Sequence, residues 1–376
     1  MIITSYEALC NLGNNIEAVY SNAIAGNTDC FDMLNDYLAN ETLRTGLIKA
    51  TLPEIKNGSF NLRCNKLLKY NLGLLKNELE ALLKKYKKDR IGVIVATTNS
   101  GVEEYEKTKN QKHSELGNPA RFIRSELDLK SFHITVSTAC SSGLKAFILA
   151  RDLLNKGICD SAIVACVDSL AKVPVYGFNS LEVLSDKPCM PFSKNRSGMN
   201  IAEASAVFIV EKEAEKGIKV MGLGESSDIY HATTPDPDAK EAINAIKLAL
   251  DDANIEADDI DYINAHGTGT IANDIMESNA IDTIFSNTPV SSTKPMTGHC
   301  LGAGAGIEVA LCAKLIEKFD GRLYPHVFDG CYDNTLKKIN LVEKNKKYEK
   351  CDIVMCNSFG FGGTNAIMIL GKSDEQ

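Results

Sequence analysis

Short apolar segments that alternate with helical patterns constrain the fold of this chain more than any other feature. The apolar segments are rich in β-branched residues and are bounded by polar or turn-forming residues, as buried strands are. They lie at residues 91–96, 134–137, 162–167, 206–210, 262–265, 353–356 and 366–370. Apolar residues recur at helical spacing around 144–154, where Gly157 is placed to end the helix, and around 307–316. This alternation predicts a layered α/β fold.

A charged connector at 212–219 separates two series of such α/β segments. We place a domain boundary there, which gives an N-terminal half at 1–212 and a C-terminal half at 213–376. The sequence STAC at 137–140 joins a strand segment to a helix, and SSTK at 291–294 precedes a glycine-rich turn and a helix. This weak similarity suggests that one unit has been duplicated.

Composition excludes several classes of protein. The 376 residues are 44% hydrophobic and 24% charged, which is typical of packed globular proteins. A formal charge of -8 argues against nucleic acid as the main partner, because phosphate binding needs a basic surface. We find no signal sequence and no long uncharged apolar segment, so we expect a cytoplasmic protein that does not enter a membrane.

The twelve cysteines show no spacing typical of a metal or redox site. There is no C-x-x-C pair, and several cysteines, such as Cys166, lie inside apolar segments where the thiol acts as a small hydrophobe. We therefore expect reduced cysteines and no bound metal. A reactive cysteine has to be found from its surroundings.

Cys140 has the surroundings of a nucleophile. It lies where an apolar strand gives way to a helix, so its thiol would face unpaired backbone N–H groups and the positive end of the helix dipole. Such a position lowers a thiol pKa and supplies donors for an oxyanion. A buried structural cysteine fits the position about equally well.

Two of the six histidines, His266 and His299, lie in glycine-rich loops. Glycines let the backbone approach a substrate closely. Either histidine alone fits a structural role, but together with Cys140 they indicate a nucleophile with proton transfer or carbonyl polarisation.

The other glycine-rich segments do not indicate a nucleotide site. Residues 302–306 lack the dinucleotide pattern and nothing matches a P-loop, so we expect neither nicotinamide nor ATP. The segment NSFGFGGTN at 357–365 follows an apolar strand. It fits a turn between antiparallel strands, a loop that delivers a backbone N–H or an aromatic gate to a pocket, or both.

Four ordered motifs resemble those of the β-ketoacyl-acyl-carrier-protein synthases of the thiolase superfamily. They are STACSSG at 137–143, NAHGTGT at 264–270, Lys294 with GHCLGAGA at 298–305, and NSFGFGGTN at 357–365. The resemblance implies a thiolase-like five-layered αβαβα fold built from two similar halves. It also implies decarboxylative Claisen condensation of an acyl chain with malonyl-acyl carrier protein, which gives 3-oxoacyl-acyl carrier protein in fatty acid, polyene or polyketide elongation.

The same resemblance assigns roles residue by residue. Cys140 is the acyl-accepting nucleophile, His266 and His299 stabilise the enolate with support from Lys294, and the N–H groups of Cys140 and Phe361 form the oxyanion hole. Phe361 is also the gate of the acyl pocket. The substrate-binding residues are Thr268, Thr270 and Phe359, and the structural carboxylates are Asp274, Glu277, Glu308 and Glu203. The family needs no cofactor of its own, because phosphopantetheine arrives on the carrier protein.

Some segments depart from the family pattern. The N-terminal strand with its loop and the segment 104–121 are short, and Pro191-Phe192 is followed by Ser193 where relatives often carry an acid. We expect a homodimer, or a heterodimer with a synthase-like partner. Five basic residues form either a docking patch for an acidic carrier protein or an ordinary charged face. They are Arg63, Lys66, Lys69, Arg121 and Arg124.

Three other functions fit these residues less well than condensation does. A biosynthetic thiolase shares the fold, but the HGTGT sequence after Ala265 differs from the thiolase pattern. A chain-length-factor-like partner subunit would not need Cys140 and both histidines. A cysteine hydrolase leaves the second histidine unexplained.

Overall fold

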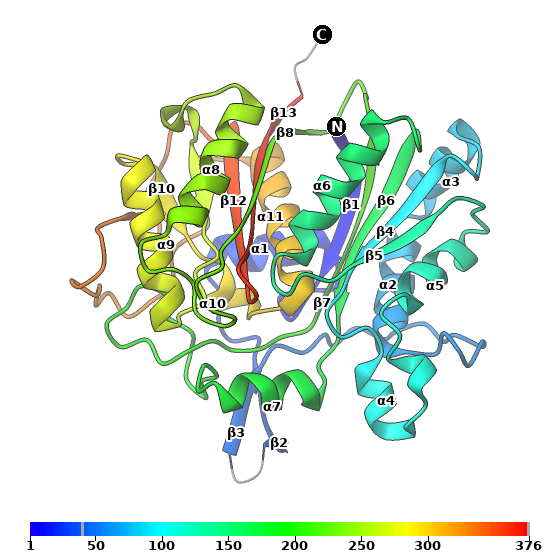
Figure 1. Ribbon diagram of the computed structural model, residues 1–376, viewed down its shortest axis with the longest axis horizontal. Helices are drawn as coiled ribbons and strands as arrows, with labels where there is room; N and C mark the ends of the chain where they lie inside the picture. The colour runs from blue at the N-terminus through cyan, green and yellow to red at the C-terminus, as the bar shows by residue number, and fades with distance from the viewer. Residues whose placement is uncertain (39–40, 374–376) are drawn as a thin grey trace.

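The computed structural model describes residues 1–38 and 41–373, which form one large sheet covered by helices (Figure 1). The strands of this sheet follow the order β11-β10-β9-β12-β13-β8-β1-β7-β6-β4-β5, and β2 pairs with β3 in a separate hairpin. The strands are β1 (Ile2–Leu9), β2 (Asp32–Leu38), β3 (Glu41–Thr45), β4 (Ile91–Ala96), β5 (His133–Val136), β6 (Ser161–Asp168), β7 (Ala204–Glu211), β8 (Ile218–Ser227), β9 (Tyr262–Asn264), β10 (Pro289–Ser291), β11 (Asn340–Leu341), β12 (Ile353–Gly360) and β13 (Thr364–Lys372). The α-helices are α1 (Ile16–Ala25), α2 (Arg63–Leu74), α3 (Lys76–Lys85), α4 (Val102–Thr108), α5 (Asn118–Glu126), α6 (Ser142–Asn155), α7 (Lys172–Ser180), α8 (Lys240–Ala253), α9 (Ile271–Ile284), α10 (Lys294–Thr297) and α11 (Gly304–Lys318).

The sheet consists of two halves with the same topology. The order β1-β7-β6-β4-β5 in the first half is repeated as β8-β13-β12-β9-β10 in the second, with the same parallel and antiparallel neighbours. A short antiparallel contact between β1 and β8 joins the halves. The domain boundary predicted after residue 212 lies in the connector between β7 and β8. It stays a prediction, because both halves contribute residues to one hydrophobic core.

Helices and strands form the five expected layers. The central layer contains α1, α6 and α11, which pack in one hydrophobic core against the inner faces of both half-sheets. The outer face of the first half is covered by α2, α3 and α5, and that of the second by α8 and α9. Figure 1 shows the central helices between these two outer groups. The thiolase-like αβαβα prediction is confirmed.

The central strands are buried on both faces, which explains their continuous apolar sequences. In β4, Val93 and Val95 pack in the outer core, whereas Ile94 and Ala96 pack against the central helices. Every residue of β4 is buried.

A close helix contact brings the two halves of the site together. At Gly143, near the start of α6, a Cβ atom would lie 2.8 Å from the Cβ of Ala305 and 3.0 Å from the backbone nitrogen of Gly306 in α11. Any larger residue would push these helices apart. Because α6 begins just after Cys140 and α11 just after the His299 loop, this contact holds both residues near one point.

All twelve cysteines carry free thiols, and Cys30 and Cys331 are the two that are only partly buried. In the described part of the chain, we find no helix with the length and apolar character needed to cross a bilayer.

Candidate active site

Cys140 lies in a tight turn between β5 and α6. Ala139 has a left-handed backbone with φ of 52°, and Ser142 Oγ accepts from the Thr138 N–H at 2.8 Å and donates to the Ala139 carbonyl at 2.5 Å. Left-handed geometry costs a non-glycine residue about 1–2 kcal/mol, so these bonds help to hold the strained turn. Ser358 Oγ of β12 donates to the Cys140 carbonyl at 2.9 Å, which ties the turn to the second half.

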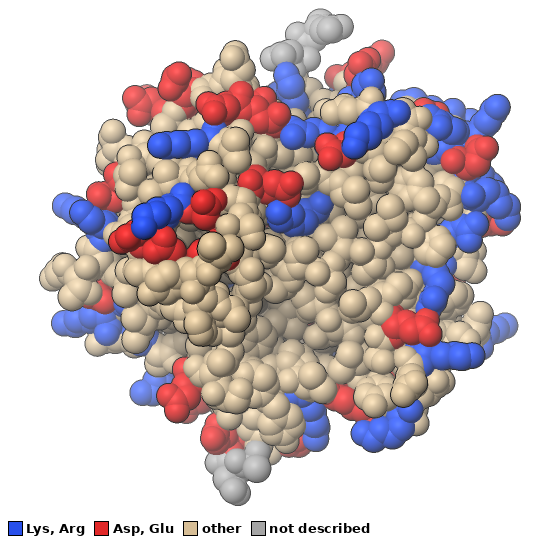
Figure 2. Space-filling view, in the orientation of Figure 1, with Lys and Arg blue, Asp and Glu red and all other residues tan. Residues whose placement is uncertain are grey.

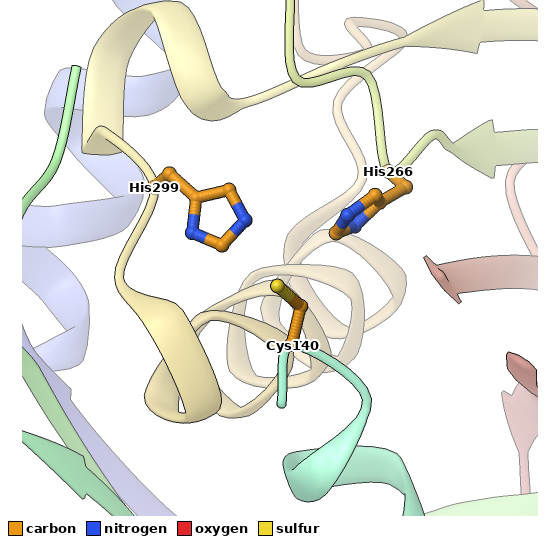
Figure 3. A group of neighbouring side chains, drawn as sticks. All are labelled: Cys140, His266 and His299. Atoms are coloured by element: carbon orange, nitrogen blue, oxygen red, sulfur yellow. The ribbon is translucent and has the colours of Figure 1, made fainter. Parts of the chain in front are cut away.

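The side chains of Cys140, His266 and His299 converge from separate elements, as the sequence predicted (Figure 3). The Cys140 Sγ and one ring nitrogen of each histidine lie within 4.8 Å of one another. The centroids of the two imidazole rings are 5.6 Å apart, and the rings are at an interplanar angle of 84°. All three residues are buried. A substrate carbonyl placed between them can therefore contact the thiol and both rings.

Lys294 fixes the orientation of His266. Its ammonium lies 3.4 Å from His266 Nδ1, and it donates to the His266 carbonyl and to Glu308 Oε1, each at 2.5 Å. Burial alone lowers the pKa of Lys294, but Glu308 more than offsets this effect and the pKa is raised. A charged donor at Nδ1 leaves the ring proton on Nε2, on the side of the cavity.

His299 is held in the same tautomer by the backbone. The Leu301 N–H donates to His299 Nδ1 at 3.1 Å, so the ring proton of the neutral form is on Nε2. Burial, strengthened by the Lys294 ammonium, lowers the pKa of His299 to about 3. The same two causes, with His299 adding to them, lower the pKa of His266 well below its usual value. Both rings are neutral donors at physiological pH.

The expected lowering of the Cys140 thiol pKa is wrong. Burial raises this pKa to about 11, although the Lys294 ammonium and the backbone N–H groups of Phe361 and Cys140 act in the opposite direction. Loss of solvent outweighs the donors at the start of α6. The thiol is therefore neutral at rest, and the two N–H groups predicted for the oxyanion hole lie at its sulfur.

The predicted carboxylates lie behind the site. Glu277 accepts from the N–H groups of His266 and Gly267, each at 2.7 Å, and thereby fixes the loop that carries His266. Asp274 accepts from the Phe192 N–H at 2.7 Å, and burial raises its pKa to about 7. Glu203 accepts from the Ile48 N–H at 2.7 Å and forms an ion pair with Arg63.

A cavity of about 380 Å³ leads to the thiol. Thr268 and Thr270 line it, and their hydroxyls are 2.9 Å apart. Phe359 packs edge-on to His266, with ring centroids 6.0 Å apart, and half-buried Phe361 contacts Phe178. The predicted lining residues are Cys140, His266, His299, Thr268, Thr270, Phe359 and Phe361.

Ser193 stands where relatives often carry an acidic residue after Pro-Phe. Acidic residues of a distant segment, Asp329 and Asp333, lie beside this turn, and the sequence did not predict this contact. Ser193 Oγ donates to Asp329 Oδ1 at 2.8 Å, and Arg196 donates to Asp333 Oδ2 at 2.6 Å. Arg196 also lines the cavity. Because the two segments are more than a hundred residues apart, no local pattern could have joined them.

Most of the predicted basic patch is already paired within the chain. Arg63 is bound to the buried Glu203, so it supports the fold rather than a free docking surface. The other ion pairs are Lys66–Glu54, Lys69–Glu126 and Arg121–Glu115.

Cys140, His266 and His299 also have the residue types and spacing of a metal site. A metal at Nε2 would require a proton on Nδ1, which in both rings already faces an N–H donor. The surrounding hydrogen bonds therefore favour donation to a substrate over metal binding.

A buried thiol, two neutral imidazole donors and a two-halved thiolase-like fold define a cysteine-dependent condensing enzyme of the ketosynthase class. The profile described as "Beta-ketoacyl synthase, N-terminal domain" matches residues 73–216, and "Beta-ketoacyl synthase, C-terminal domain" matches residues 218–320. The chain belongs to the beta-ketoacyl synthase family.

Curated relatives carry the name 3-oxoacyl-[acyl-carrier-protein] synthase 2. The one from Coxiella burnetii is 35% identical over 274 residues, which span 66% of this chain and 64% of that protein. The one from Staphylococcus aureus is 26% identical over 410 aligned positions, with 99% of this chain and 98% of that protein covered.

A solved structure is similar over the whole chain. It is described as the ketosynthase ApeO in complex with its chain length factor ApeC, from Xenorhabdus doucetiae. Its matching chain has a TM-score of 0.94 and 36% identity, with 99% of this chain and 98% of that chain covered.

Proposed function

We propose that the protein catalyses the decarboxylative Claisen condensation of a Cys140-bound acyl group with a malonyl thioester on an acyl carrier protein. The observation that carries this proposal is the pair of neutral imidazoles, each with its Nε2–H directed at the cavity in front of one thiol. An acyl transfer alone needs no such pair. A carbonyl that gains negative charge while a carboxylate leaves needs two aligned donors.

The first half-reaction loads the enzyme. The Cys140 sulfur attacks the acyl thioester carbonyl, and the backbone N–H groups of Cys140 and Phe361 stabilise the oxyanion. The carrier sulfur leaves with the proton that the thiol has lost. The product is an acyl-enzyme thioester and a free carrier thiol.

The second half-reaction forms the carbon–carbon bond. His266 and His299 donate to the thioester carbonyl of the malonyl group, and the carbon–carbon bond to the carboxylate breaks to release carbon dioxide. The resulting enolate carbon attacks the acyl carbonyl on Cys140, whose thiolate is expelled. The product is a 3-oxoacyl thioester on the carrier.

Thr268 and Thr270 are placed to contact the phosphopantetheine arm in the approach to the thiol. Their paired hydroxyls line the same cavity as His266. The enzyme needs no further cofactor in this scheme, because the arm arrives on the carrier. We place the reaction in the cytoplasm, where a reactive thiol stays reduced.

A second copy or a synthase-like partner completes the functional unit. β5 is the last strand of the large sheet, and in the described part of the chain it pairs only with β4. An open strand edge is a site for pairing with another chain. The 36% identity with a chain of a ketosynthase–chain length factor complex favours a heterodimer as the alternative to a homodimer.

Two variants test the reaction. Cys140→Ala should abolish acylation and condensation, and Cys140→Gln should retain only decarboxylation of malonyl carrier protein. Intact-protein mass spectrometry and detection of acetyl carrier protein report these steps. An acyl mass shift that persists in Cys140→Ala contradicts the nucleophile assignment, and condensation of two acetyl thioesters without malonyl would indicate a thiolase.

A further inference from the structure

Asp168 is a completely buried carboxylate at the end of β6 that the sequence analysis did not single out. Oδ1 accepts from Thr97 Oγ1 at 2.8 Å and from the N–H groups of Thr98 and Asn99 at 2.9 and 2.8 Å. Oδ2 accepts from the Gly302 N–H at 2.8 Å. One carboxylate therefore joins the segment after β4, in the first half, to the loop that carries His299, in the second.

The contact with Gly302 is next to the group that orients His299. The Leu301 N–H donates to His299 Nδ1 at 3.1 Å, and the following N–H, that of Gly302, donates to Asp168. Two consecutive backbone donors are thus directed at the imidazole and at the carboxylate.

This loop needs support because its backbone is strained. Leu301 has a φ of 53°, and a left-handed conformation costs a residue with a large side chain about 1–2 kcal/mol. A hydrogen bond to a charged group is strong enough to offset that cost. At Gly302 a Cβ atom would lie 2.9 Å from Asp168 Oδ2, so the glycine allows the close approach.

We propose that Asp168 is a positioning residue for His299. Through Gly302 and Leu301 it holds the imidazole in the tautomer that presents Nε2–H to the malonyl carbonyl. The inference rests on the proposed function, and it predicts that Asp168 serves decarboxylation rather than loading of Cys140.

The test compares the two half-reactions in Asp168→Asn. The amide keeps the size of the side chain but puts an NH2 group among the N–H donors. Decarboxylation of malonyl carrier protein should fall about 10- to 100-fold, as expected for loss of one hydrogen bond to a charged group. Acylation of Cys140, followed by intact-protein mass spectrometry, should stay near the wild-type rate.

Thr97→Val is the matched control. It removes one hydrogen bond to the same carboxylate, and the acceptor of the Ser100 N–H, on the side away from His299, so both half-reactions should be retained. Nitrogen-15 NMR of the histidine rings gives an independent readout, because Asp168→Asn should shift the His299 signals toward the other tautomer. If the Asn variant does not fold by circular dichroism, Asp168→Ser is assayed in the same way.

Equal loss of both half-reactions in a folded variant, or the same split in Thr97→Val, would overturn the inference. If Asp168→Asn decarboxylates malonyl carrier protein as fast as an active wild type, the inference about Asp168 is also wrong. The proposed condensation function is not affected by that result. A wild-type protein that cannot decarboxylate the malonyl group would instead contradict the proposed function.

Discussion

At the scale of single residues, Cys140 combines a nucleophile's position with a thiol that is protonated at rest. Burial raises its pKa to about 11, and Lys294 is the first of the groups that oppose this rise. The thiolate fraction should therefore increase about tenfold for each pH unit between 7 and 10. We expect the rate of Cys140 alkylation by iodoacetamide, followed by peptide mass spectrometry, to increase in the same proportion.

Lys294→Met should slow this alkylation at pH 8, because removal of the ammonium leaves the Cys140 pKa even higher. Lys240→Met replaces an exposed lysine in the second half and serves as the control, with an unchanged rate expected. An alkylation rate that levels off near pH 7 would show that the thiol is already ionised and would contradict this prediction.

The two imidazoles should not titrate in the physiological range. A histidine is charged only below its pKa, which is about 3 for His299 and well below the usual value for His266. Nitrogen-15 NMR between pH 5 and 8 should show both rings neutral, with Nε2 protonated and Nδ1 bare. His113, which is only partly buried, gives a separate ring signal in the same spectrum. A midpoint between pH 6 and 7 for either buried ring would disprove the assignment.

The sequence indicated which side chains would meet at the site but not their electrostatics. Cys140, His266 and His299 were found because strand-to-helix and glycine-rich turns are visible as local patterns. The direction of the Cys140 pKa shift was predicted wrongly, because helix donors are local whereas burial depends on the packing of both halves. Asp168 was missed for the same reason, since its partners at 97–99 and Gly302 are distant in sequence.

At the scale of elements, the turn between β12 and β13 depends on contact with the loop after β8. Asp228 donates its N–H to the Gly363 carbonyl at 2.7 Å, and a Cβ at Gly363 would lie 1.8 Å from the Asp228 carbonyl oxygen. Gly363→Ala should therefore displace the turn that carries Phe361. We expect a lower melting temperature and slower acylation of Cys140.

Gly362→Ala is the matched control for this substitution. Gly362 also has a left-handed backbone, with φ of 83°, but a Cβ there would meet nothing within 4 Å. The Gly362→Ala substitution should lower the free energy of unfolding only by the cost of a left-handed alanine, about 1–2 kcal/mol. Equal effects of both alanines on acylation would show that the Asp228 contact does not position the turn.

The entrance of the cavity has exposed apolar residues that fit the docking of a carrier protein. Ile229 is 97% exposed and Ile271 is 66% exposed, and both belong to segments that line the cavity. Figure 2 shows that the centre of the face in view is largely uncharged. Ile229→Ser should raise KM for an acyl carrier protein about tenfold, in line with the burial of one isoleucine side chain.

A small acyl thioester should be used by Ile229→Ser as well as by the wild type, because it does not need the docking surface. Leu248→Ser removes an exposed apolar residue from α8 and should change neither KM. A larger KM for both substrates would place Ile229 in the channel rather than in carrier docking.

Strands with continuous apolar sequences could be predicted, whereas strands at the joint between the halves could not. The segments at 91–96 and 162–167 lie within β4 and β6. β8 was missed because its sequence mixes polar residues and glycine with apolar ones, and β1, which also contains polar residues, was expected only from the family resemblance. Packing against α8 explains the glycine at position 224 in β8, because a Cβ there would lie 2.0 Å from the Ala245 carbonyl oxygen.

At the scale of the whole molecule, two topologically equivalent halves build one site. Cys140 follows β5, and the SSTK segment with Lys294 follows β10, the equivalent strand of the second half. The faint sequence similarity between these segments thus reflects equivalent positions in the fold. Which helices would form the shared central layer was not predicted, although α11 is buried along almost its whole length and α3 only at Leu79 and Leu82.

The shared core predicts that the halves depend on each other. They are joined in the sheet by two residue pairs between β1 and β8, but α6 and α11 pack together in one core. Separated fragments 1–212 and 213–376 would each expose the central helices to water, and each would lack part of the Cys140, His266 and His299 site. Neither fragment should fold cooperatively or condense an acyl group with malonyl carrier protein.

A cut in the folded protein should have a different effect. The connector between Glu211 and Ile218 is largely exposed, so a protease site inserted there can be cleaved after folding. The nicked protein should keep its core and most of its condensation activity, because the cut breaks no contact of the site. The uncut protein with the same insertion is the control. Activity in either isolated fragment would contradict the shared site, and dissociation of the nicked protein on size exclusion would contradict the shared core.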